Sequence, residues 1–169
     1  MTVRPITTLR VMSRSPADTQ ELARGLGLLV TAGDIVLLGG DLGAGKTTFT
    51  QGLARAMGVT EPVTSPTFTL IRTYQGASHL QLLHADVYRL EHLQEIIDLG
   101  LPELIEEGSV AVIEWGDVAA SVFMPDYLDV RIEFGDEYNE RAIVLRPVGS
   151  RWAARIGQLT ELKDPAGSP

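Results

Sequence analysis

The sequence predicts an α/β fold, in which a mainly parallel sheet is flanked by helices and carries an antiparallel C-terminal hairpin. Three observations carry this prediction. Short, continuous apolar runs alternate with segments of helical periodicity, as expected for parallel strands that are buried on both faces. A glycine-rich loop joins one such run directly to a helical segment. In the last third of the chain, residues 128–134 alternate between apolar and polar side chains, which is typical of antiparallel strands.

The first predicted helix lies within residues 15–33. Ser15 and Pro16 are helix start signals, and Gly33 is a stop signal. Between them, apolar residues recur at helical spacing, namely Leu22, Leu26, Leu29 and Val30. The apolar run 34–40 predicts a buried strand, and the segment 45–58 predicts a helix that ends at Gly58. Strand, glycine loop and helix therefore follow one another directly.

The middle of the chain predicts two further strands with a crossover between them. The apolar runs 80–86 and 109–115 contain Asp86 and Glu114 at or near their ends, and residues 92–108 have a helical pattern. Residues 127–134 and 141–146, joined by a polar turn, predict the antiparallel hairpin that extends the sheet. Residues 1–163 are expected to form a single domain, and the small, polar and proline-rich residues 164–169 a disordered tail.

Composition excludes several classes of function. The 169 residues are 44% apolar and carry a formal charge of −8 with a pI of about 4.8, which argues against direct tight binding of RNA or DNA by this chain. The absence of cysteine excludes disulfides and thiolate metal sites. The first 15 residues lack the apolar core of a signal peptide, and no apolar run approaches the roughly 20 residues of a membrane helix. We therefore expect a cytoplasmic protein with no membrane association.

Residues 40–47, GDLGAGKT, fit the phosphate-binding pattern G-x-x-x-x-G-K-[ST] at every fixed position. Glycines let the backbone curl so that successive N–H groups point at phosphate oxygens, and the helix N-terminus adds its positive dipole end. Lys46, one of only two lysines in the chain, would reach the β- and γ-phosphates, and the Thr47 hydroxyl would ligate Mg²⁺. The predicted nucleotide-binding residues here are Asp41, Leu42, Gly43, Ala44, Gly45, Lys46, Thr47 and Thr48. The fold expected around this motif is that of P-loop NTPases.

A hydrolytic site of this kind also needs a carboxylate on the metal, directly or through water, usually from the end of another strand. Asp86 and Glu114 are both placed for this, and residue patterns alone leave open which one contacts Mg²⁺ and which orients the attacking water. The segment 64–69, TSPTFT, stands where nucleotide-dependent switch loops follow the P-loop helix. An ordinary loop leading into a strand is the alternative interpretation of that segment.

Other polar and aromatic residues carry weaker signals. His84 and His92 have no metal-ligand spacing with His79, so we expect hydrogen-bonded or exposed histidines rather than a zinc site. Trp115 would pack either on a base or ribose or in the core. Arg89 would either supply positive charge to a transition state or form a surface ion pair.

The stretches GDLGAGKTT, SPTFTL, HADVYRL and IEW, in this order and spacing, resemble the bacterial TsaE (YjeE) family of small P-loop ATPases over roughly residues 17–135. The family's H-x-D-x-Y-R pattern stands intact at residues 84–89. The resemblance implies an ATP-dependent component of the machinery that makes N6-threonylcarbamoyladenosine (t6A) at the tRNA adenosine beside the anticodon. It further implies that the chain acts with the TsaD and TsaB subunits, that the transfer chemistry belongs to the partner, and that tRNA is contacted only indirectly.

The same resemblance implies roles for individual residues, with ATP and Mg²⁺ as cofactors. Thr47 and Glu114 would bind Mg²⁺, and Asp86 would be the catalytic residue most tied to hydrolysis, together with Lys46 and Glu114. The remaining nucleotide contacts would come from Thr67 in a switch loop, from Trp115 near the nucleotide, and from Thr19 in the first helix on the adenine side.

Two other functions remain open on the sequence. A small-molecule kinase with a P-loop needs an arginine-rich lid, yet no arginine lies between Glu114 and Arg131. A nucleotide-sensing module without turnover would keep the same phosphate site. A GTPase is nearly excluded, because the chain's sole asparagine, Asn139, is followed by Glu140 rather than by the lysine of a guanine-reading motif.

Overall fold

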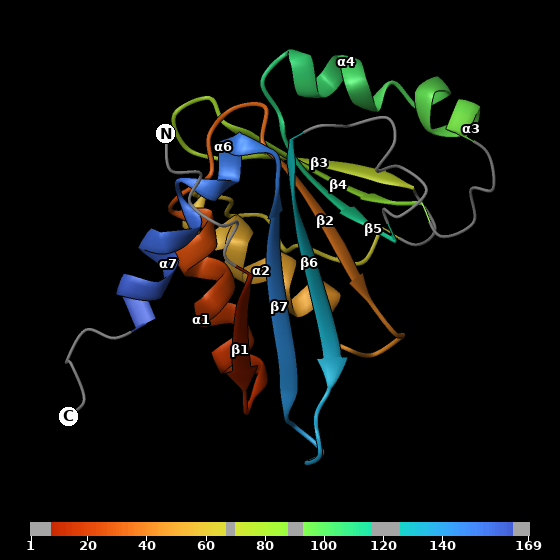
Figure 1. The fold of residues 1–169 in the computed structure, drawn as a ribbon. Coiled ribbons are helices and arrows are strands. Elements are labelled where there is room, and N and C mark those ends of the chain that lie inside the picture. Colours follow the sequence, from red (N-terminus) through yellow and green to blue (C-terminus); the bar gives the residue numbers. More distant parts are fainter. Residues whose placement is uncertain (1–7, 67–69, 88–92, 116–125, 164–169) are drawn as a thin grey trace.

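The computed structural model of the chain describes residues 8–66, 70–87, 93–115 and 126–163. Within these ranges, seven strands form one sheet in the order β1-β7-β6-β2-β5-β4-β3 (Figure 1). The strands are β1 Leu9–Ser13, β2 Ile35–Gly40, β3 Ile71–Gln75, β4 Gln81–Asp86, β5 Val110–Glu114, β6 Tyr127–Phe134 and β7 Arg141–Val148. The helices are α1 Pro16–Gly27, α2 Lys46–Ala56, α3 Leu93–Asp98, α4 Leu101–Glu106, α6 Ser150–Ala153 and α7 Ile156–Lys163.

The four central strands are parallel, and the outer strands are antiparallel. β2 pairs in parallel with β5 and β6, and β4 pairs in parallel with β5. β7 is antiparallel to β6 and β1, and β3 is antiparallel to β4. The predicted α/β class and the C-terminal hairpin are therefore confirmed. The prediction of a single domain over residues 1–163 stays a prediction, and residues 164–169 lie outside the described residues.

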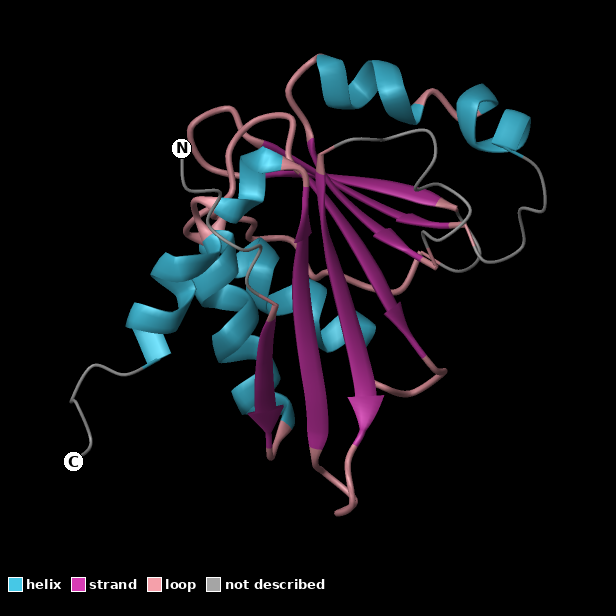
Figure 2. Ribbon diagram, viewed as in Figure 1, coloured by secondary structure: helices cyan, strands magenta, loops and turns pink. Residues whose placement is uncertain are grey.

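Two apolar clusters bury the two faces of the sheet. The larger cluster joins α1, α2, α6 and α7 to one face, and the smaller one joins α4 to the other face of the central strands. Figure 2 shows α1, α2 and α7 grouped together and α3 and α4 at another end of the sheet. Among the described residues, no helix has the length and apolar character needed to cross a bilayer.

The first helix is shorter than predicted, because it ends at Gly27 and not at Gly33. The Leu28 N–H bonds back to the Arg24 carbonyl and closes the last turn. Leu29 and Val30 continue the apolar spacing because the loop that contains them packs on the larger core cluster. The apolar residues therefore keep a helical spacing for three positions after the end of α1.

Two edge strands and one divided helix differ from the sequence pattern. No local pattern predicted the short edge strand β1, and β3 was anticipated only by the alternative interpretation of residues 64–69 as a loop leading into a strand. Each is defined by its partner, β7 or β4. The helical pattern of residues 92–108 is divided into α3 and α4 at Gly100, whose φ of 76° interrupts the helix.

The C-terminal helices are anchored to the loop before β2 by a buried carboxylate. Asp34 is fully buried, and both of its oxygens accept hydrogen bonds from Arg155, at 2.6 and 2.8 Å. Arg151 Nε lies 2.8 Å from Asp34 Oδ1, and the Arg155 guanidinium stacks on the Trp152 ring at 4.0 Å. These contacts connect α6 and α7 to the N-terminal half of the chain.

Gly52 allows the closest approach between α1 and α2. A Cβ atom added at Gly52 would fall well inside van der Waals distance of the Gln20 carbonyl oxygen. Gly52→Ala is therefore expected to destabilise the protein by about 2 kcal/mol and to lower Tm by about 4–8 °C, because the two helices must separate. Thermal unfolding followed by circular dichroism measures this.

Gly157→Ala is the matched control, because a Cβ at this exposed α7 position meets no atom within 4 Å. It is expected to leave Tm unchanged or to raise it slightly, since alanine favours helix. Equal Tm values for Gly52→Ala and the wild type would contradict the close helix contact.

Candidate functional site

The glycine-rich loop lies between the end of β2 at Gly40 and the start of α2 at Lys46, as predicted. Gly43 and Gly45 have φ values of 81° and 111°, which side chains disfavour. Gly45 is the N-cap residue of α2, and it offers no side-chain cap to the first backbone N–H groups. Unfilled donors at the N-terminus of an 11-residue helix form an anion-binding site.

Lys46 is nearly buried at this loop, with a side chain folded back on the backbone. Its Nζ donates hydrogen bonds to the carbonyl oxygens of Gly40 at 2.7 Å and Asp41 at 3.3 Å. The ammonium also lies 4.3 Å from the centre of the Trp115 ring. Burial lowers the pKa of Lys46 from its ordinary value, and the nearby carboxylates of Glu114, Asp86 and Asp41 oppose this shift.

The two predicted carboxylates meet at one edge of the sheet. Asp86 ends β4, Glu114 ends β5, and the two residues are opposite one another in the parallel register. Both are largely buried, at 5% and 3% exposed. The sheet edge where parallel strands end thus brings together two acidic groups that are 28 positions apart in sequence.

Trp115 follows Glu114 in a conformation unusual for a bulky residue. Its φ is 61°, in the left-handed region, and its N–H donates to the Leu38 carbonyl oxygen at 3.0 Å. Such a conformation costs about 1–3 kcal/mol and is typical of functional sites. The indole of this residue faces the ammonium of Lys46.

A cavity of about 600 Å³ contains most of the predicted site. It is lined by Leu42, Gly43, Gly45, Lys46, Thr47, Thr48, Ser65, Asp86, Glu114 and Trp115. Ala44 lines a neighbouring cavity, and Asp41 contributes its carbonyl to Lys46. Thr67 lies outside the described residues.

A second cavity of about 120 Å³ adjoins the first and shares Gly43, Gly45 and Thr48 with it. Thr19 lines this second cavity and is only 3% exposed, and its adenine-side role stays a prediction. The Thr19 hydroxyl lies 2.7 Å from the Ser13 hydroxyl, so it also holds β1 to α1. Thr19 therefore forms part of the cavity wall, while its hydroxyl already has a hydrogen-bond partner in Ser13.

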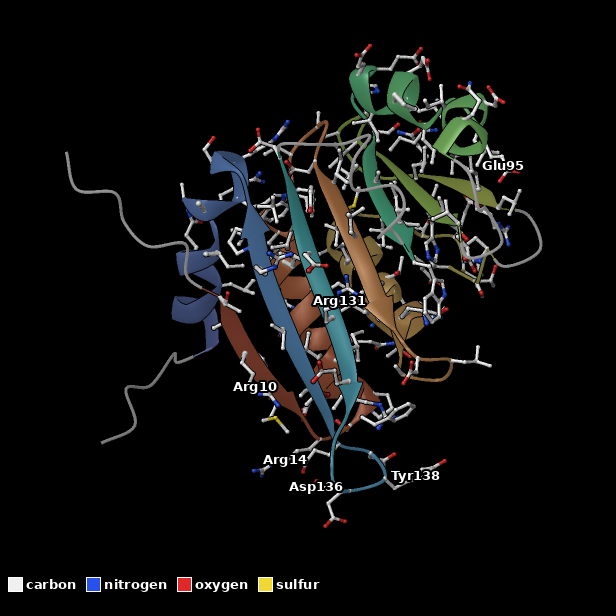
Figure 3. All side chains as sticks on the ribbon, turned by 45° about the vertical axis from the view of Figure 1, so that its right-hand side comes forward. Arg10, Arg14, Glu95, Arg131, Asp136 and Tyr138 are labelled. Atoms are coloured by element: carbon white, nitrogen blue, oxygen red, sulfur yellow. The ribbon has the colours of Figure 1, made fainter. Side chains whose placement is uncertain are left out.

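The β6–β7 hairpin contributes site residues that sequence reasoning did not find. Asn139 and Arg141 line the second cavity, and Arg141 Nε donates to the Ala44 carbonyl oxygen at 3.0 Å. Figure 3 shows the hairpin tip projecting at the end of the sheet, with Asp136 and Tyr138 on it. Asn139 lies in the predicted turn and Arg141 at the start of the predicted strand, and no local pattern connects either residue to a loop almost 100 positions earlier.

His84 was also missed as part of the site. Its Nε2 lies 2.9 Å from Glu114 Oε1, and the side chain is fully buried. A sequence signal existed, because His84 and Asp86 are two positions apart in a strand and so share a face.

The donor set fits a magnesium ion that is completed by a nucleotide. Within the described ranges, no cluster of three or more His, Asp or Glu side chains could hold a metal by itself. Mg²⁺ at phosphate sites uses one or two carboxylates, with phosphate oxygens and waters as the other ligands. Thr47, Asp86 and Glu114 line the same cavity and offer hard oxygen ligands of this kind.

Comparison with known proteins identifies the relatives of this chain. The model of the family "TsaE: Threonylcarbamoyl adenosine biosynthesis protein TsaE" matches residues 13–143. The chain is 45% identical over 119 residues to a Treponema pallidum protein, covering 70% of this chain and 86% of the relative. It is 40% identical over 147 residues to a Bacillus subtilis protein, covering 86% and 90%. Both relatives are named "tRNA threonylcarbamoyladenosine biosynthesis protein TsaE".

A solved structure has the same fold. The crystal structure of B. subtilis YdiB superposes with a TM-score of 0.80 at 31% sequence identity, over 95% of this chain and 99% of YdiB.

Proposed function

Since the chain belongs to the TsaE family, we propose that it is a Mg²⁺-dependent P-loop ATPase that supports t6A formation in tRNA. Family membership confirms the resemblance predicted from the motifs. The observation that carries the ATPase proposal is the convergence of Lys46, Thr47, Asp86 and Glu114 on one cavity beside the N-terminus of α2.

In this proposal the triphosphate lies along the glycine loop. The backbone N–H groups at the start of α2 bind phosphate oxygens, and Lys46 Nζ exchanges its carbonyl partners for the β- and γ-phosphates. Thr47 and Glu114 hold Mg²⁺, which neutralises charge between the phosphates when it is bound. The nucleoside extends toward the second cavity, where the Asn139 amide and the Arg141 guanidinium offer hydrogen-bond donors.

Asp86 is proposed to act on the attacking water. Its carboxylate lines the cavity beside Glu114, one strand further from the glycine loop. A carboxylate in this place orients a water molecule toward the γ-phosphate by accepting a hydrogen bond from it. The nearly complete burial of both carboxylates strengthens these interactions by excluding solvent.

The tRNA modification is proposed to be carried out by partner subunits of the TsaD and TsaB type. The net charge of −8 and the absence of any lysine or arginine from residue 90 to residue 130 do not favour binding of tRNA by this chain alone. The nucleotide state would then act through the complex, since a ligand shifts an equilibrium only by binding its two states differently.

The experiment measures steady-state phosphate release by the purified chain, alone and with TsaD and TsaB, together with t6A formed over many turnovers. We expect slow hydrolysis by the chain alone and a steep rise with the partners, because the complex orders groups around the γ-phosphate. Equal phosphate release in both cases, with modification proceeding when this chain is omitted, would refute the proposal. Phosphate transfer to a small acceptor would favour the kinase alternative. Nucleotide binding without turnover in any mixture would favour the nucleotide-sensing alternative.

A further inference from the structure

His84 is a buried polar side chain in an apolar environment. It lies in β4, on the sheet face that α2 covers, and is 0% exposed. Its cross-strand partner in β5 is Val112, also fully buried, while Asp86 is opposite Glu114. The imidazole therefore lies two positions before the strand ends that carry the two carboxylates, and it is not among the residues that line the cavity of about 600 Å³. An imidazole in such a place needs a hydrogen bond to offset its loss of water.

That hydrogen bond goes to Glu114. His84 Nε2 lies 2.9 Å from Glu114 Oε1, and the Glu114 side chain is only 4% exposed. A carboxylate only accepts hydrogen bonds, so Nε2 must be the donor. His84 Nδ1 has no hydrogen-bond partner among the described residues. Among the described residues a proton on Nδ1 would have no acceptor, so the geometry favours the tautomer with the proton on Nε2.

The bond restricts the orientation of the Glu114 carboxylate. The imidazole binds one carboxylate oxygen, Oε1, and does not bind the other, Oε2. A glutamate side chain has three rotatable bonds, and ordering them on metal binding would cost affinity. A hydrogen bond made before the metal arrives removes part of that cost, as the outer partners of metal ligands generally do.

We propose that His84 is a positioning residue that orients the Glu114 carboxylate for Mg²⁺ through an Nε2–H donor. This inference rests on the proposed function, since it takes Glu114 to be a metal ligand. It assigns a task to a histidine that has neither metal-ligand spacing nor contact with the nucleotide cavity.

The first test examines the chain without nucleotide or metal. Long-range proton–nitrogen NMR of the imidazole distinguishes a protonated from an unprotonated ring nitrogen. We expect His84 to be protonated at Nε2 and unprotonated at Nδ1. A ring protonated at Nδ1 alone would overturn the inference, whatever the protein does with ATP.

The second test measures the Mg²⁺ dependence of nucleotide binding with a non-hydrolysable ATP analogue. His84→Leu removes the donor, and the half-saturating Mg²⁺ concentration is expected to rise at least about tenfold, while analogue affinity in EDTA changes by less than about twofold. His84→Gln restores an N–H donor of similar reach and is expected to recover much of the Mg²⁺ affinity.

Val112→Ala is the matched control, because it changes a fully buried side chain opposite His84 without touching the carboxylate. It is expected to lower Tm and to leave the Mg²⁺ titration unchanged. A folded His84→Leu with wild-type Mg²⁺ dependence, or with equal losses in Mg²⁺ and in EDTA, would overturn the inference alone. A wild-type chain that binds the analogue with no effect of Mg²⁺ would overturn the proposed function and this inference together.

Discussion

Replacing Asp86 with asparagine is expected to reduce ATP turnover by about 100-fold or more while leaving ATP affinity nearly unchanged. Asparagine has almost the same shape as aspartate, but it lacks the negative charge and presents an amide in place of one oxygen. Asp86 lies opposite Glu114 at the end of β4 and lines the proposed nucleotide cavity, where it can orient water without being required for phosphate binding. Single-turnover phosphate release and calorimetry with a non-hydrolysable analogue measure the two quantities separately.

Glu114→Gln is the paired variant for this experiment, since Glu114 occupies the matching position on the neighbouring strand. We expect it to weaken the Mg²⁺-dependent part of nucleotide binding, because an amide is a poorer magnesium ligand than a carboxylate. The opposite pattern, with Mg²⁺ dependence lost in Asp86→Asn and kept in Glu114→Gln, would show that the two roles are reversed. Full turnover in Asp86→Asn would remove Asp86 from the mechanism.

Replacing Lys46 with alanine is expected to weaken ATP binding tenfold or more, equivalent to the loss of about 1.5–3 kcal/mol from a charge-assisted phosphate contact. The lysine is nearly buried, so its interaction with a phosphate is poorly screened by solvent. Its present partners are the carbonyls of Gly40 and Asp41 and the Trp115 ring. None of these partners carries a formal negative charge, whereas phosphate oxygens would give the Lys46 ammonium a negatively charged partner. Isothermal titration calorimetry with ATP and Mg²⁺ measures the change.

Arg55→Ala is the control for Lys46→Ala. Arg55 is an exposed cation on the same helix, α2, and it does not line the proposed nucleotide cavity. Removing it changes the net charge of the chain by the same amount, so ATP affinity should stay within about twofold of the wild type if long-range electrostatics are screened. ATP affinity that is equal in wild type and a folded Lys46→Ala protein would refute the phosphate-binding role of Lys46.

The sequence by itself determined the features that depend on short stretches of chain. The strand, glycine loop and helix around Lys46 form as predicted, because positive φ angles, a helix N-terminus and an apolar run are all encoded within about 20 neighbouring residues. The juxtaposition of Asp86 and Glu114 was also predictable, because parallel strands joined by a right-handed crossover end at the same edge of a sheet. Their separate roles stay predictions.

Only the tertiary structure decided which distant residues complete the site. β1 and β3 have no periodicity that distinguishes them from loops, and each becomes a strand because a neighbour supplies its hydrogen bonds. Arg141 reaches the Ala44 carbonyl because β6 pairs with β2, a choice of strand order that no local signal encodes. The contact of His84 also could not be predicted from the sequence alone. Strand alternation places it on the face of Asp86, yet its hydrogen bond to Glu114 depends on the register of β4 against β5, which packing of both sheet faces sets.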